Sequence, residues 1–188
     1  MIKKYLYSLP LLAFSTFAFA HPGHALISLQ AGFTHPFVGW DHLLMMIAVG
    51  LWASRQGGNS RWQLPTLFVG FMAVGAIVGF TGIGIAGIEA TIAIGLVLMG
   101  VLLFMHQSVP KGVAIAFVSV IGIAHGLAHG LELIGQPYTA ALVGMLIATA
   151  LLHTVGYFTG SLHGKLARYV HAVFATGMLL TGGLLLAS

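Results

Sequence analysis

Two imidazoles and a carboxylate stand within eight residues, in the segment His35-Pro36-Phe37-Val38-Gly39-Trp40-Asp41-His42. The segment opens an apolar stretch that runs to Ala53. Imidazole and carboxylate groups are ligands for divalent transition metals, and ionisable groups in an apolar environment are costly unless they are paired or bind something. The segment therefore predicts a metal site.

A second set of such groups lies much later, in the segment His125-Gly126-Leu127-Ala128-His129-Gly130-Leu131-Glu132. His129 and Glu132 follow His125 by four and seven residues. In an α-helix these spacings place side chains on one face. We predict that this helix presents two imidazoles and a carboxylate to the same partner.

The inventory of polar residues limits the chemistry. The chain has ten histidines, only three acidic residues and no cysteine. Disulfides, thiolate zinc sites and iron–sulfur clusters are therefore excluded. The remaining ligands are histidine, carboxylate, methionine and backbone oxygen, a set that suits nickel, cobalt, copper or zinc.

The composition predicts an all-α, polytopic membrane protein. Of the 188 residues, 59% are hydrophobic and 5% are charged, and the mean hydropathy is +1.02. So few polar groups cannot cover a soluble globule of this length. The net charge of +4 comes from basic residues scattered around hydrophobic segments, without a basic patch, and we expect no nucleic-acid partner.

The first twenty residues resemble a secretory signal peptide, which we expect to be cleaved. Lys3 and Lys4 form the basic region, the apolar region follows from Leu6 to Phe17, and Ala18-Phe19-Ala20 supplies the small residues of a cleavage site. The alternative is an uncleaved first helix, but the apolar stretch is short and contains Pro10. Cleavage would make His21 the mature N-terminus.

Residues 21–188 are predicted to form one domain of six transmembrane helices. No soluble domain is visible, and glycines recur within the apolar segments, as is typical of closely packed membrane helices. Two inverted three-helix repeats are an alternative organisation. The expected segments are about Phe33–Ser54, Leu64–Thr81, Gly84–Met105, Gly112–Ile134, Thr139–Gly160 and Tyr169–Ala187.

The distribution of basic residues predicts the orientation in a bacterial inner membrane. The loops with Arg55 and Arg61, then Lys111, then Lys165 and Arg168 all fall on one side, which is cytoplasmic by the positive-inside rule. Both mature termini are then periplasmic. This topology gathers all three acids and four histidines into the periplasmic half, and these are our predicted metal ligands: His35, Asp41, His42, Glu89, His125, His129 and Glu132.

The predicted ligands raise a question of geometry and also have structural interpretations. In a regular helix Asp41 points about a third of a turn away from His35 and His42, but Pro36 and Gly39 predict an unwound turn that lets Asp41 swing inward. Polar residues in membrane helices also serve as interhelical hydrogen-bond partners. Glu89, at the start of the third helix, has the alternative role of a helix N-terminal acid.

The remaining histidines have less defined roles. His21 and His24 form either a metal-capture point or an ordinary tail. His106 and His163 are interpreted as interfacial residues, whereas packing and an ion exit path are both open for His153 and His171. Methionines such as Met45 and Met46 are interpreted as packing residues, although they would soften the site towards copper(I).

The motifs His-Pro-x-x-Gly-x-Asp-His and His-Gly-x-Ala-His-Gly-x-Glu resemble those of the HupE/UreJ family of nickel and cobalt permeases. The resemblance extends over nearly the whole mature chain. It implies that His35, Asp41 and His42 bind metal together with His129, Glu132 and His125. It also implies uptake of Ni²⁺ for hydrogenase or urease maturation, or of Co²⁺ for cobalamin.

We therefore expect a secondary metal carrier in the lipid bilayer, not an enzyme, with no tightly bound cofactor. The chain has no phosphate-binding loop for ATP, so the ion gradient, the membrane potential or protons must drive transport. One alternative is an intramembrane zinc-dependent hydrolase, in which the same groups hold a water-activating metal. Sensor, structural and haem-binding roles are further alternatives, although acids fit haem ligation poorly.

Overall fold

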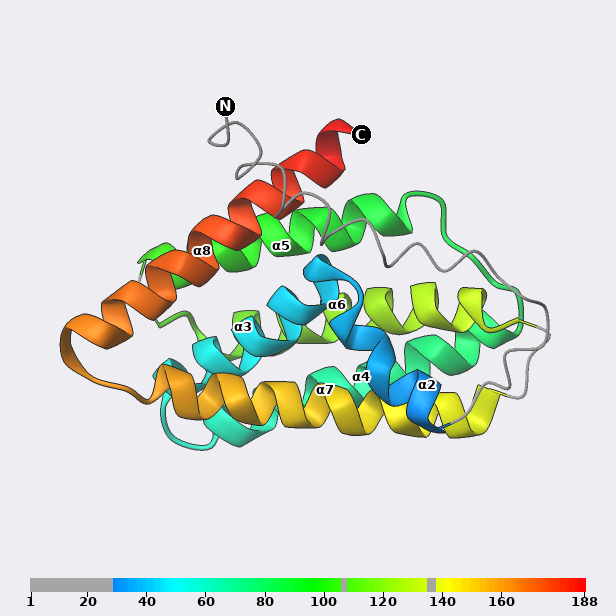
Figure 1. Ribbon diagram of the computed structural model, residues 1–188, viewed down its shortest axis with the longest axis horizontal. Coiled ribbons are helices and arrows are strands. Elements are labelled where there is room, and N and C mark those ends of the chain that lie inside the picture. Colours follow the sequence, from blue (N-terminus) through cyan, green and yellow to red (C-terminus); the bar gives the residue numbers. More distant parts are fainter. Residues whose placement is uncertain (1–28, 106–107, 135–137) are drawn as a thin grey trace, which may run out of the picture.

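The computed structural model describes residues 29–105, 108–134 and 138–188. These residues form seven α-helices and a short 3₁₀-helix, and no strand is found among them, which confirms the all-α class. The predicted signal peptide lies outside the described residues. The helices are α2 (Leu29–Thr34), η2 (His35–Phe37), α3 (Trp40–Gln56), α4 (Ser60–Phe80), α5 (Ile88–Met105), α6 (Lys111–Glu132), α7 (Tyr138–Gly160) and α8 (Gly164–Ala187) (Figure 1).

Five of the described helices, α4 to α8, are long and apolar enough to cross a membrane. A sixth span exists if the segments Leu29–Phe37 and Trp40–Gln56 count as one broken span, since they pass the same test together but are bent by 84°. These helices fit a multi-pass membrane protein. The described residues thus give five continuous candidate spans, and the sixth expected span stays a prediction that depends on the broken pair.

The predicted break between Pro36 and Gly39 is present. Pro36 lies in the first turn of η2, and Gly39 is extended, with φ −94° and ψ 122°, just before α3 begins. Proline fixes its own φ and lacks an N–H donor, whereas glycine adopts many backbone conformations at low cost, so the two residues favour an interruption. The break separates His35 from the helix that carries Asp41 and His42.

The helices pack in pairs, α4 along α6, α3 along α7 and α5 along α8, and α2 also packs on α7. In Figure 1, α5 and α8 cross the upper part of the molecule, α4 and α7 the lower part, and α3 and α6 lie between them. The predicted sixth segment begins earlier than expected, at Gly164, because Lys165 and Arg168 continue the helix instead of preceding it. The core is apolar and rich in methionine, with Trp52 and Phe68 among its largest buried side chains.

Glycines set the spacing between paired helices. A Cβ atom built on Gly126 of α6 would overlap the carbonyl oxygen of Met72 in α4. Likewise, a Cβ atom on Gly50 of α3 would overlap the carbonyl oxygen of His153 in α7. The backbones approach each other directly at both places, as expected for helices that associate by close packing in lipid.

Candidate metal site

The two His-Gly pairs of α6 contact two neighbouring helices, α4 through the glycines and α3 through the histidines. Gly126 and Gly130 lie against the backbone of α4. His125 and His129, each one residue earlier, are 0% and 1% exposed and turn towards the start of α3. A spacing of four residues places both histidines on one helical face and both glycines on the adjacent one. The motif therefore fixes helix packing and ligand direction together.

One group of ligand atoms joins η2 to the end of α6. The Nε2 atom of His35 lies 3.1 Å from Nδ1 of His129 and 3.5 Å from Oε2 of Glu132. The same Glu132 oxygen is 3.4 Å from Nδ1 of His129. These three ligand atoms lie within 4.8 Å of one another, close enough to hold a metal ion. We call them the rim group, because Glu132 is 55% exposed whereas His129 is buried.

Asp41 acts on the histidine that follows it. Its Oδ1 atom lies 2.9 Å from Nδ1 of His42. A carboxylate only accepts hydrogen bonds, so His42 donates through Nδ1 and its Nε2 keeps a free lone pair. Metal-binding histidines are commonly held in this way by a carboxylate. The structure thus places Asp41 beside the ligand atoms, where it orients His42.

Two buried imidazoles and the half-buried imidazole of His42 form a second, deeper group. The ring centroid of His42 lies 4.6 Å from that of His129 and 5.3 Å from that of His125. His125 donates through Nδ1 to the carbonyl oxygen of Ile121, at 2.9 Å. The Nε2 atoms of all three rings are buried and have no hydrogen-bond partner among the described residues. We call these three histidines the deep group.

Unsatisfied buried nitrogen atoms are costly, so their concentration in the deep group is evidence for a ligand. His129 belongs to both groups, since its Nδ1 faces His35 and Glu132 while its Nε2 is one of the unpaired atoms. The rim and deep groups therefore lie on two sides of one imidazole. Together they offer nitrogen and oxygen donors without sulfur, which suits a borderline divalent metal.

The structure brings together six of the seven predicted ligands. Glu89 is exposed in the first turn of α5, and it is not part of the rim group. Its role in the site remains a prediction. His21, His24 and His106 lie outside the described residues, and His163 is exposed at the start of α8.

Sequence reasoning missed one residue beside the site. The Phe68 ring of α4 is fully buried, and its centroid is 5.6 Å from that of His125. A phenylalanine within an apolar helix carries no signal that separates it from ordinary core residues. Only the packing of α4 against α6 reveals its position.

Comparison with known proteins supports the family resemblance that the two motifs indicate. Residues 9–185 match the family model described as HupE / UreJ protein. The chain is also similar to protein HupE of Rhizobium leguminosarum bv. viciae, with 38% identity over 181 residues, covering 95% of each chain. No solved structure matches the chain.

Proposed function

The chain belongs to the HupE/UreJ family, which is associated with nickel and cobalt uptake, and on this premise we propose that it carries Ni²⁺ or Co²⁺ across the bacterial inner membrane. The observation that carries the proposal is the pair of ligand groups that share His129. Mixed imidazole and carboxylate donors accept both ions. In this proposal the metal ion is the transported substrate and not a cofactor of the protein.

The two groups suggest an order of binding. A hydrated ion meets the exposed Glu132 carboxylate and His35 first, because they are the accessible members of the rim group. Rotation or exchange at His129 then passes the ion to the Nε2 atoms of His42 and His125. Each step replaces water by imidazole, so no charge enters the apolar interior without ligands.

The proposed orientation places this site on the periplasmic side. Basic residues lie at the opposite end of the bundle, where α3 ends and α4 begins, and the positive-inside rule assigns that end to the cytoplasm. A cleaved signal peptide and periplasmic mature termini complete the proposed topology. The imported metal would serve hydrogenase, urease or cobalamin.

The membrane potential is a sufficient driving force. Two positive charges that move inward gain about 4.6 kcal/mol per 100 mV, twice the value for a single charge. Family members are transporter-type proteins and not known enzymes, and the alternative of an intramembrane zinc hydrolase has no support from the comparisons. We therefore propose a secondary carrier that the membrane potential drives.

The test is ⁶³Ni²⁺ uptake by cells that lack their own nickel importers. We expect the wild-type chain to take up Ni²⁺ and His129→Ala to lose at least nine-tenths of the initial rate, because this change removes a ligand from both groups. His163→Ala is the matched control, since His163 is exposed and remote from the site. Excess Co²⁺, Cu²⁺ or Zn²⁺ identifies the preferred metal by competition. Equal uptake by wild-type protein and His129→Ala, both present in the membrane, would refute the site.

A further inference from the structure

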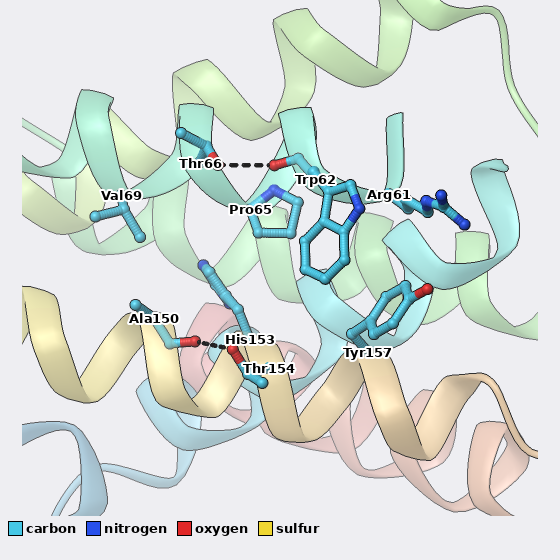
Figure 2. Close-up of a pocket in the computed structure, with 9 residues that line it drawn as sticks. All are labelled: Arg61, Trp62, Pro65, Thr66, Val69, Ala150, His153, Thr154 and Tyr157. Carbon is cyan, nitrogen blue, oxygen red and sulfur yellow. Dashed lines mark hydrogen bonds between the residues drawn. The ribbon is translucent and has the colours of Figure 1, made fainter. Parts of the chain in front are cut away.

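A pocket of about 290 Å³ lies between α4 and α7, at the end of the bundle opposite the metal site. Figure 2 shows Trp62 and Arg61 of α4 facing Tyr157 of α7, with the His153 ring reaching from α7 towards α4. The rings of Trp62 and Tyr157 are 5.0 Å apart and form one wall. His153 is a metal-ligand side chain that the proposed site leaves unused.

His153 is held in the same way as the deep-group histidines. It is 2% exposed, and its Nδ1 atom donates a hydrogen bond to the carbonyl oxygen of Met46 in α3. Its Nε2 atom is therefore the lone-pair nitrogen. This atom is buried and has no hydrogen-bond partner among the described residues. Because His153 lines the pocket, a ligand in the pocket would supply the partner that this lone pair lacks.

The Phe68 ring packs against both His153 and a histidine of the metal site. The centroid of its ring is 5.1 Å from that of His153 and 5.6 Å from that of His125. This fully buried ring thus packs against one histidine of the deep group and against His153, which lines the pocket. Phe68 therefore links the deep group to the pocket histidine by direct packing contacts.

From this arrangement we propose that His153 and the pocket form a second, weaker divalent-metal station, reached from the deep group past Phe68. The proposal rests on the proposed function. His153 would supply one nitrogen and pocket water the other ligands. Thr66 and Thr154 line the pocket, and each donates its hydroxyl proton to the carbonyl oxygen four residues earlier, that of Trp62 and that of Ala150, both at 2.8 Å. Their oxygen lone pairs remain available to metal-bound water.

The charges around the pocket make the station weak. None of the described residues that line the pocket is acidic, and Arg61 is an exposed lining residue at the start of α4. A divalent ion bound there has one imidazole and a nearby positive charge, whereas the rim group offers a carboxylate. Transport requires binding strong enough to draw the ion in and weak enough to release it. A site that binds the ion tightly, followed by a site that binds it weakly, meets both requirements.

The first variant is His153→Asn, because the asparagine amide can replace the Nδ1 donor to Met46 while removing the Nε2 lone pair. We expect the initial rate of ⁶³Ni²⁺ uptake to fall at least fivefold. Equilibrium dialysis of the purified full chain against ⁶³Ni²⁺ should show one weakly bound ion fewer, with the tight binding unchanged. Lost uptake with unchanged weak binding would mean that His153 only packs helices, and would overturn the proposal.

The second variant fills the pocket without changing His153. Ala150 lines the pocket, whereas Val155 of the same helix is 53% exposed and does not line it. We expect Ala150→Phe to slow uptake at least fivefold and Val155→Phe to match the wild-type chain. If His153→Asn fails to reach the membrane, the comparison of Ala150→Phe with Val155→Phe tests the proposal instead.

The outcomes separate the station from the transport function. If the wild-type chain takes up Ni²⁺ and both His153→Asn and Ala150→Phe transport at its rate, the station is wrong and the proposed function stands. If the wild-type chain takes up no Ni²⁺, the proposed function fails. The dialysis result then still decides whether His153 binds a metal, since loss of the weak ion in His153→Asn supports the station and its retention refutes it.

Discussion

Hydrogen bonds at the Nδ1 atoms decide what the buried histidines can do. The Asp41 carboxylate holds His42, and a backbone carbonyl oxygen holds His125, so both rings present Nε2 to the interior. Groups that orient a ligand in this way fix its tautomer and ring orientation and raise its basicity, so their loss weakens metal binding. Asp41 therefore has a positioning role towards His42 in addition to its predicted role as a metal ligand.

Substitution of Asp41 tests this positioning role. Asp41→Asn keeps an oxygen that accepts the His42 hydrogen bond but removes the charge, whereas Asp41→Ala removes both. Loss of such a partner typically weakens metal binding by about 10- to 100-fold. We expect Asp41→Ala to show the full loss in Ni²⁺ affinity and Asp41→Asn a smaller one, measured on purified protein. Wild-type affinity in Asp41→Ala would contradict the role.

The sequence predicted which side chains gather at the site more completely than it predicted their contacts. His125, His129 and Glu132 share a face because the period of the helix requires it. The pairing of Asp41 with His42 depends on the backbone after Gly39, where a Cβ atom would come within 2.7 Å of the Asp41 carboxylate. The position of Phe68 depends on how α4 packs between α6 and α7. Neither contact is encoded in a local pattern.

Among the elements, the break before α3 was predictable and its angle was not. Pro36 and Gly39 indicate an interruption from their backbone preferences alone. The bend of 84° depends on α2 packing against α7, where Gly32 and Gly144 permit close approach of the backbones. The break lets His35 and His42 reach α6 from two separate elements.

The contact between α4 and α6 is testable with two glycine substitutions. Gly126→Ala introduces a Cβ atom against the Met72 carbonyl oxygen, and overpacking of this kind costs about 1–3 kcal/mol. Gly70→Ala is the matched control, because nothing lies within 4 Å of its Cβ position and alanine favours a helix. We expect the thermal unfolding midpoint in detergent to fall for Gly126→Ala and to hold or rise for Gly70→Ala. Equal midpoints would mean that the two helices separate easily.

At the scale of the whole molecule, the ligands lie in one half of the bundle and the proposed exit pocket in the other. In the proposed direction, transport of a divalent ion moves two positive charges inward. In proteoliposomes we expect the initial rate of Ni²⁺ uptake to rise with an inside-negative potassium diffusion potential and to fall when the potential is reversed. A rate that is independent of potential would instead indicate electroneutral exchange.

The Phe68 ring has a consequence for the energy supply of the cell. A file of water that connected the buried histidines to the pocket would conduct protons from molecule to molecule, and the protonmotive force would dissipate through each copy of the protein. An apolar ring excludes water from a constriction by dewetting. Because Phe68 is fully buried and packs against both His125 and His153, it would interrupt such a file of water. On the proposed route the two imidazoles would hand the metal ion past the ring, while the ring would exclude the water that conducts protons.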